Sequence, residues 1–151
     1  MTRLRCAVLI VIALVIAGPV LVQAQAPSGL RFTVEEMLKL RRVSDPQLSP
    51  DGRFVAYVVT DVSLEKNRRV GHLWVVPVAG GEPVALVHED KADTSPRWSP
   101  DGKRLAFLST RDDGSQVWVV DMAQGRAVGK PRQVTTVATE VSSFTWSPDE
   151  I

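Results

Sequence analysis

Short apolar runs, each preceded by a turn, recur along this chain and predict β-strands rather than helices. Residues 54–59 (Phe-Val-Ala-Tyr-Val-Val) are apolar at both alternating sets of positions, and residues 105–108 (Leu-Ala-Phe-Leu) repeat this pattern. A strand with one face in water would alternate apolar and polar side chains, because successive side chains point to opposite faces. These runs therefore predict middle strands that are covered on both faces.

The turn before each run is Ser-Pro-Asp-Gly, starting at Ser49 and at Ser99, and a third Ser-Pro-Asp starts at Ser147. Proline presets φ at the second turn position, and glycine takes the left-handed φ that closes a bulged hairpin. An apolar residue precedes every copy, namely Leu48, Trp98 or Trp146. Each copy is therefore interpreted as a hairpin between two strands and not as a catalytic loop.

The spacing of the repeats predicts a β-propeller. The copies start 50 and 48 residues apart, and the strands around Trp74 and Trp118 repeat with a step of 44 residues. Repeats of roughly 40–50 residues are typical of propeller blades. The difference in step lies in a preceding loop, which has 12 residues between Thr60 and Leu73 and 6 between Thr110 and Val117.

Each unit then holds four short strands, with turns at Gly80-Gly81 and at Gly125. The predicted fold is all-β: an incomplete propeller of four-stranded antiparallel blades, preceded by a signal peptide and one short helix. Blade 1 is expected at about 46–87, blade 2 at about 96–136, and the start of blade 3 at about 144–151. The four tryptophans occupy matching repeat positions, Trp74 matching Trp118 and Trp98 matching Trp146, and such positions predict packing between blades and not ligand stacking.

The first 24 residues have the pattern of a secretory signal peptide. Arg3 and Arg5 precede an apolar run that a Gly-Pro pair interrupts, and small residues lead to a cleavage site after Ala24. This predicts a periplasmic or secreted protein with no membrane segment after cleavage, and an uncleaved anchor is the alternative. Cys6 lies within the signal, so the mature chain has no cysteine.

Residues 25–45 are interpreted as a linker and a lead-in helix at about 34–42. Thr33 can cap the helix with Glu36 completing a capping box, and Phe32 with Met37 can form a hydrophobic staple. Basic residues follow where the helix dipole favours cations, namely Lys39, Arg41 and Arg42. The helix is expected to lead structurally into blade 1.

Composition argues against several functions. The net charge is +1 for the whole chain, which gives no basic field for nucleic acid. No nucleophile elbow, phosphate-binding glycine loop or metal-binding motif occurs, so no catalytic, cofactor-binding or metal-binding residue and no cofactor is predicted.

Three local features receive structural interpretations. His72 and His88 are interpreted as turn residues without a second metal ligand. Asp112-Asp113-Gly114 is interpreted as a hairpin turn, since it lacks the spaced oxygen ligands of a calcium loop. The small basic cluster 66–69 (Lys-Asn-Arg-Arg) is interpreted as a solvated loop tip, with partner contact as the alternative.

Two stretches resemble a known family: residues 32–38 (Phe-Thr-Val-Glu-Glu-Met-Leu) and residues 41–52, which run from Arg-Arg-Val-Ser-Asp-Pro to the first Ser-Pro-Asp-Gly. They resemble the N-terminus of exported bacterial serine peptidases of the prolyl oligopeptidase family. The members concerned are acylaminoacyl-peptidases and dipeptidyl-peptidase-like enzymes. In that family a propeller covers an α/β-hydrolase domain that carries Ser, Asp and His, and it restricts access to short peptides. The resemblance implies this domain and peptide substrates as partners.

No residue of this sequence corresponds to the family's catalytic residues. The chain is therefore interpreted as a non-catalytic N-terminal propeller fragment of a serine peptidase. The repeat also resembles the propeller of TolB, so a periplasmic protein-binding scaffold is the alternative. An incomplete ring leaves two blade faces open, either those with Val55, Tyr57, Leu105 and Phe107 or the opposite sides of the same strands, and the chain alone is therefore expected to self-associate.

Overall fold

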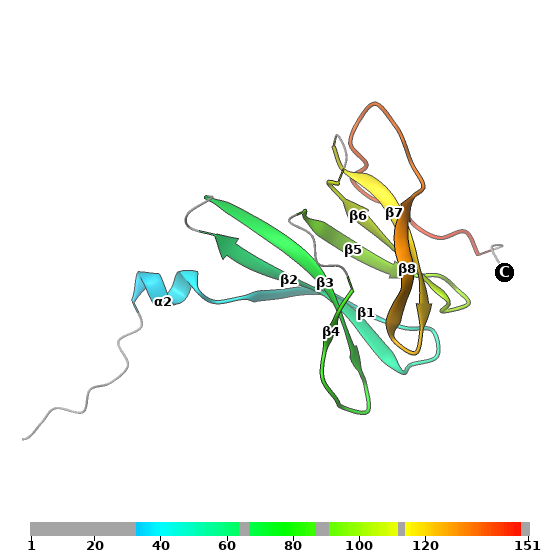
Figure 1. Cartoon of the computed structure of the whole chain (residues 1–151), viewed down its shortest axis with the longest axis horizontal. Helices are drawn as coiled ribbons and strands as arrows, with labels where there is room; N and C mark the ends of the chain where they lie inside the picture. The colour runs from blue at the N-terminus through cyan, green and yellow to red at the C-terminus, as the bar shows by residue number, and fades with distance from the viewer. Residues whose placement is uncertain (1–32, 64–66, 87–90, 112–113, 149–151) are drawn as a thin grey trace, which may run out of the picture. The chain divides into compact units, whose positions relative to one another are not determined.

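The computed structural model describes residues 33–63, 67–86, 91–111 and 114–148. They contain one helix, α2 (Val34–Leu38), and eight strands (Figure 1). The strands are β1 (Arg42–Leu48), β2 (Phe54–Ser63), β3 (Arg68–Pro77), β4 (Val84–Ala85), β5 (Asp93–Trp98), β6 (Arg104–Ser109), β7 (Gln116–Ala123) and β8 (Arg126–Gln133). The expected signal peptide, its cleavage site, Cys6 and Phe32 lie outside the described residues. Among the described residues, no helix is long and apolar enough to cross a membrane.

The strands form two four-stranded antiparallel sheets in the orders β1-β2-β3-β4 and β5-β6-β7-β8. Each sheet is a meander in which every strand pairs with the next one along the chain (Figure 1). This is the arrangement of a propeller blade, and the expected fold of an incomplete β-propeller is confirmed. Blade 1 begins with β1 at Arg42 and blade 2 with β5 at Asp93, slightly before the positions expected from the repeat.

The third expected blade has no strand within the described residues, since 134–148 form none. A first blade strand pairs with the second strand of its own blade, and here that strand would follow Asp149, past the described region. Phe144 and Trp146 instead pack on blade 2.

The lead-in helix is shorter than expected. Thr33 caps it by accepting a hydrogen bond from the backbone N–H of Glu36 (3.2 Å), which confirms the predicted N-cap. The helix ends at Leu38 and not at Arg42, so the expected C-terminal boundary is wrong. Arg42 belongs to β1, where it lies opposite Thr60. Helix α2 buries none of its residues, so packing does not stabilise a longer helix. The backbone of Arg42 therefore pairs with β2 and does not continue the helix.

The longer segment between Thr60 and Leu73 is mostly strand and not loop. In blade 2 the middle hairpin ends at the pair Ser109 and Gln116, and the matching pair in blade 1 is Val59 and His72. From there β2 and β3 continue through four more pairs, the last joining Ser63 to Arg68. The extra residues therefore lengthen the hairpin of blade 1 beyond that of blade 2.

Both blades carry the same irregularity in the first strand. The pairing register shifts between Ser44 and Gln47 in β1, and between Thr94 and Arg97 in β5. Asp45 (φ 48°) and Ser95 (φ 54°) occupy the left-handed region at these bulges. A bulge bends its strand locally, and each one here stands just ahead of a Ser-Pro-Asp-Gly turn.

Each Ser-Pro-Asp-Gly turn closes with the same hydrogen bonds. The hydroxyl of Ser49 donates to Asp51 Oδ1 (2.6 Å) and accepts from the backbone N–H of Phe54 (3.0 Å). In the second copy the corresponding distances are 2.6 Å to Asp101 and 2.9 Å from Arg104. Gly52 and Gly102 have φ of 71° and 68°, the left-handed conformation predicted for the turn.

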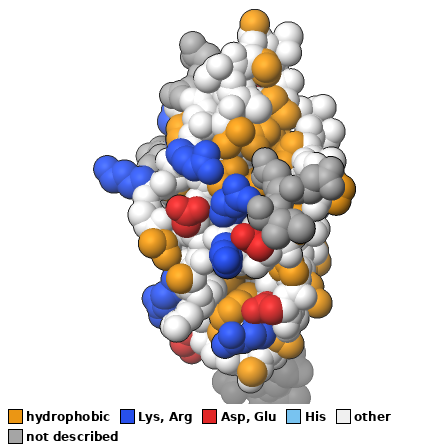
Figure 2. Space-filling model, turned by 90° about the vertical axis from the view of Figure 1, so that its right-hand side faces the viewer, with side chains coloured by type: hydrophobic (Ala, Val, Ile, Leu, Met, Phe, Trp, Pro, Cys, Tyr) orange, Lys and Arg blue, Asp and Glu red, His pale blue; other side chains and the backbone are white. Residues whose placement is uncertain are grey.

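The main core lies between the two blades. It combines residues from both sheets: Ala56, Val58, Leu73, Val75, Leu86, Leu105, Phe107, Val120 and Met122. A second cluster covers the other face of blade 2, where Ala106, Leu108, Val117 and Val119 pack with Val141, Phe144 and Trp146. The expected burial of both faces is thus found in β6, whose residues from Leu105 to Ser109 are all buried. On the surface shown in Figure 2, basic, acidic and apolar side chains are intermixed.

Candidate functional site at the blade junction

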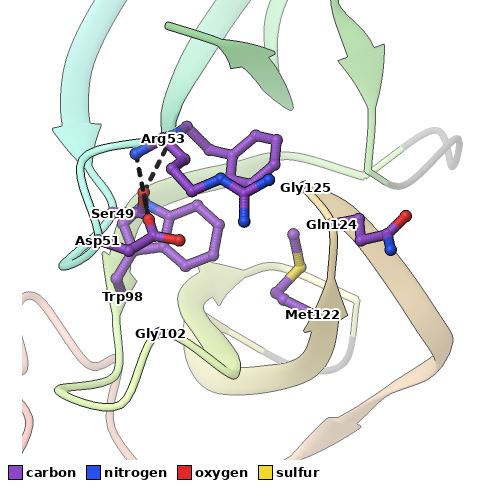
Figure 3. Close-up of a pocket in the computed structure, with 9 residues that line it drawn as sticks. Ser49, Asp51, Arg53, Trp98, Gly102, Met122, Gln124 and Gly125 are labelled. Carbon is purple, nitrogen blue, oxygen red and sulfur yellow. Dashed lines mark hydrogen bonds between the residues drawn. The ribbon is translucent and has the colours of Figure 1, made fainter.

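Several polar side chains lie where blade 1 meets blade 2, among them Ser49, Asp51, Arg53 and Gln124. A pocket of about 90 Å³ opens at this junction, between the first Ser-Pro-Asp-Gly turn and the β7–β8 hairpin (Figure 3). Arg53 and Met122 point into it, and the ring of Trp98 forms one wall. The pocket is far smaller than the roughly 300–1,000 Å³ of a typical ligand site.

The β7–β8 hairpin presses directly on blade 1. Gln124 and Gly125 both have positive φ, 51° and 73°, which matches the tight hairpin turn whose twist suits the flanking strands. A Cβ at Gly125 would lie 2.5 Å from ring atoms of Phe54. Gly125 is therefore required for the turn and also for the contact between the blades.

Tryptophans join successive repeats through hydrogen bonds. The indole N–H of Trp98 donates to the carbonyl of Gln47 (3.1 Å), and that of Trp146 donates to the carbonyl of Arg97 (2.9 Å). Gln47 and Arg97 each stand two residues before the serine of a turn, so the same bond is made at both junctions. This confirms the prediction that Trp98 and Trp146 act in packing between repeats.

An ion pair links the bulges of the two blades. Arg97 Nη1 lies 2.9 Å from Asp45 Oδ2, and Asp45 Oδ1 also accepts from Gln47 Nε2 (2.7 Å). Asp45 is the bulge residue with positive φ. The bulge therefore turns this carboxylate toward the next blade.

A second ion pair is buried within blade 2. Arg111 Nη2 lies 2.8 Å from Asp93 Oδ2, and their side chains are 8% and 1% exposed. The Arg111 guanidinium also lies over the rings of Phe107 and Trp118, with its central carbon 5.4 Å from each centroid. Burial raises the pKa of Asp93, and Arg111 opposes that shift.

The turn carboxylates behave in the opposite way. The hydrogen bond from Ser49 lowers the pKa of Asp51, and that from Ser99 lowers the pKa of Asp101. Both carboxylates also accept from backbone N–H groups, of Arg53 (3.1 Å) and Lys103 (3.0 Å). These aspartates complete the turns and are not placed as acids or bases for a substrate.

The residues singled out in the sequence take structural positions. His72 lies inside β3 opposite Val59, so its interpretation as a turn residue is wrong. His88 and Asp112-Asp113 lie outside the described residues. Arg68 and Arg69 are exposed but belong to β3 and not to a loop, and Lys66 lies outside the described residues.

The contacts at the junction pack the two blades together. Within residues 33–63, 67–86, 91–111 and 114–148, no three His, Cys, Asp or Glu side chains lie close enough together to hold a metal. Sequence reasoning missed the Asp93–Arg111 pair. The available signal was Asp93, a charged residue at the repeat position that Val43 occupies in blade 1.

The chain is similar in sequence to part of two longer proteins that are named as peptidases. The chain is 37% identical over 119 residues to the uncharacterized peptidase YuxL of Bacillus subtilis, a match that covers 78% of this chain and 18% of YuxL. It is 31% identical over 125 residues to dipeptidyl-peptidase 5 of Porphyromonas endodontalis, covering 83% of this chain and 18% of that protein. The chain therefore spans about a fifth of the length of these relatives.

The chain is also 35% identical over 72 residues to the Tol-Pal system protein TolB of Coxiella burnetii. This shorter match covers 48% of this chain and 16% of TolB. Among solved structures, the acylaminoacyl peptidase of Pyrococcus horikoshii matches with a TM-score of 0.59 and 29% identity, over 75% of this chain and 16% of that one. No protein-family model matches the sequence. Through its blades and its curated relatives, the chain is a homologue of the propeller region of prolyl-oligopeptidase-like peptidases.

Proposed function

We propose that this chain is the N-terminal, non-catalytic propeller section of an exported serine peptidase that hydrolyses short peptides. The proposal rests on the extent of the two peptidase matches. They cover 78% and 83% of this chain, but only 18% of the length of each peptidase. The remaining length of such a peptidase has room for an α/β-hydrolase domain. In this proposal the propeller restricts access to that domain.

Export is part of the same proposal. The pattern of residues 1–24 supports secretion with cleavage after Ala24. Mass spectrometry of the periplasmic or secreted protein is expected to find Gln25 as the first residue. An intact terminus at Met1 or Thr2 would contradict cleavage.

The most direct test of the peptidase proposal is to examine the complete product of the source gene. We expect its complete product to contain a Gly-x-Ser-x-Gly nucleophile elbow after further blades. A fluorophosphonate probe should then label that serine, and alanine in its place should abolish the labelling. The present 151-residue chain is the matched control and should remain unlabelled. Additional blades followed by a stop codon, with no labelling, would rule the peptidase out.

The TolB match supports a second candidate, a periplasmic scaffold that binds proteins without catalysis. Two TolB matches cover 48% and 74% of this chain at 35% and 30% identity, against 78% and 83% at 37% and 31% for the two peptidases, and the scaffold is therefore the weaker proposal. Capture of periplasmic proteins by the complete gene product, together with no probe labelling, would favour the scaffold.

A further inference from the structure

A groove of about 680 Å³ lies between the lead-in segment and the lengthened hairpin of blade 1. The described residues that line it come from α2, the link to β1, β1 itself, β2 and β3. Blade 2 reaches blade 1 as far as Gly71, where a Cβ would lie 3.1 Å from the carbonyl of Asp93. The hairpin pairs that include Val62 and Arg69 lie beyond this point.

The strand residues of the groove share one face of the sheet. Thr60 pairs with Arg42 in β1, and Val62 pairs with Arg69 in β3. Directly opposed residues point to the same face, and so do residues two apart. This is the face on which Val58 is buried against blade 2, so the groove continues the blade junction beyond the edge of blade 2.

The groove is basic. Arg41, Arg42 and Arg69 line it, and none of its described lining residues is acidic. Arg41 already forms an ion pair with Asp61 (2.9 Å). No ion pair joins Arg42 or Arg69 to another residue of the described chain, so two guanidinium groups have their charge available for a ligand.

Apolar side chains complete the lining. Met37 and Leu40 are 49% and 60% exposed, and Leu38 and Val62 lie beside them in the groove. Helix α2 buries none of its residues. The lead-in therefore presents apolar surface next to arginines, with the hydroxyls of Ser44 and Thr60 as additional hydrogen-bonding groups.

We propose that this groove binds a free peptide in extended form that carries carboxylate and apolar side chains. Its volume lies within the range of about 300–1,000 Å³ typical of ligand sites. Arginine pairs with carboxylates through two parallel hydrogen bonds, and the apolar lining receives the intervening side chains. A single-stranded nucleic acid fits less well, since such sites use stacked aromatic rings and none of the described lining residues is aromatic. The inference does not depend on the peptidase proposal.

The test measures fluorescence anisotropy of a labelled short peptide of alternating leucine and glutamate, with the complete product of the gene carrying alanine at any nucleophile-elbow serine, so that the peptide is not hydrolysed. Binding is expected to weaken with added salt. Peptides with lysine in place of glutamate, or serine in place of leucine, should each bind at least about tenfold more weakly. Arg42→Gln and Arg69→Gln should each weaken binding of the first peptide about fivefold.

Arg132→Gln is the matched control, because Arg132 is an exposed arginine on β8 in the other blade. It should leave binding unchanged, and circular dichroism should show that all three variants retain the wild-type melting temperature. The proposal fails if the wild-type protein does not bind the peptide, as it would if another segment of the same polypeptide covered the groove. It also fails if the lysine peptide binds as tightly as the glutamate peptide, or if Arg132→Gln weakens binding as much as Arg42→Gln. A third contrary result would be that only single-stranded DNA binds and that Arg42→Gln weakens its binding.

Discussion

Blade 1 and blade 2 have closely similar repeats but differ in how much of each is buried. In blade 2 the middle strand is buried on both faces, by blade 1 on one side and by residues 141–146 on the other. In blade 1 Ala56 and Val58 are buried against blade 2, whereas Tyr57 is only partly buried. The residue at the position of Tyr57 in blade 2 is Phe107, which is fully buried. The burial of a blade residue therefore depends on the neighbour that its face meets.

The structure decides between the two sides left open for each blade. In blade 2 the side with Leu105 and Phe107 is covered, since both residues are 0% exposed between the blades. The outer face of blade 1 carries Val55 and Tyr57, together with Val43 and Leu48, which are 64% and 60% exposed. In a propeller each blade covers the face of the next, and the outer face of blade 1 is where a further blade would pack.

The largest effect is expected on the association state. A polypeptide of residues 25–151 should self-associate through the outer face of blade 1, because contiguous apolar surface of this kind is rarely exposed on a monomer. Val43→Lys combined with Leu48→Lys should shift it toward monomer in size-exclusion chromatography. The control is Val128→Lys with Val134→Lys, which changes exposed valines of blade 2 and the segment after it (53% and 52% exposed). A monomeric unmodified polypeptide would contradict the prediction.

The second prediction compares equivalent core positions. Phe107→Ala should lower the free energy of unfolding by about 3–5 kcal/mol, because it leaves a cavity in the core between the blades. Tyr57→Ala should cost less, about 1–2 kcal/mol, because Tyr57 is only partly buried. Urea denaturation in the Val43→Lys, Leu48→Lys background measures both.

If Phe107→Ala does not fold, Phe107→Leu provides the comparison and should still cost more than Tyr57→Leu. Equal losses at the two positions would show that the outer face of blade 1 is as well packed as the junction.

The third prediction concerns the contact between Gly125 and Phe54. Gly125→Ala should destabilise the protein more than Gly129→Ala, since both positions have positive φ (73° and 77°) but a Cβ at Gly129 meets nothing within 4 Å. Backbone strain of about 1 kcal/mol or more is common to both, and the overlap with the ring adds about 1–3 kcal/mol at Gly125. Thermal unfolding measures the difference.

Shortening the ring should then relieve the overlap. In the Phe54→Leu background the cost of Gly125→Ala should fall toward that of Gly129→Ala. An unchanged difference would mean that the overlap with Phe54 is not its cause.

The smallest effects concern acid stability, where the two turns should behave alike. The pKa of Asp51 and of Asp101 is lowered from the ordinary 3.8, mainly by hydrogen bonds from Ser49 and Ser99. Each carboxylate therefore stabilises the fold above pH 3.8, and this contribution is lost as the pH falls through the lowered value. Asp51→Asn and Asp101→Asn should each make unfolding less sensitive to pH below about 4, by similar amounts. A response in only one blade would contradict the equivalence of the turns.

Asp93, in blade 2, should have the opposite effect on the pH dependence of stability. Burial raises its pKa above 3.8, so the folded state binds its proton more tightly than the unfolded state does. Its contribution to stability falls as the pH rises from 3.8 through the raised value. The free energy of unfolding, measured across this pH range, should therefore decrease with pH in the wild-type protein and no longer do so in Asp93→Asn. An unchanged pH dependence in the variant would show that another group causes it.

The sequence by itself determined the features that depend on neighbouring residues. The Ser-Pro-Asp-Gly turns, the Thr33 cap and the four-strand meander follow from local backbone preferences and from the apolar runs, and all of them are present. The packing role of Trp98 and Trp146 was also predictable, because their spacing repeats with the turns. The signal peptide stays a prediction.

Tertiary structure decided what depends on residues far apart in the chain. The Asp93–Arg111 pair, the contact of Gly125 with Phe54 and the arginine groove join segments that no local pattern connects. The lengthened β2–β3 hairpin replaced an expected loop, because pairing across strands stabilised residues that have no strong strand pattern of their own. Helix α2 ended early for the same reason, since β1 gained its partners from β2. A sequence read locally shows where strands begin and turn, while the folded chain determines which faces and charges meet.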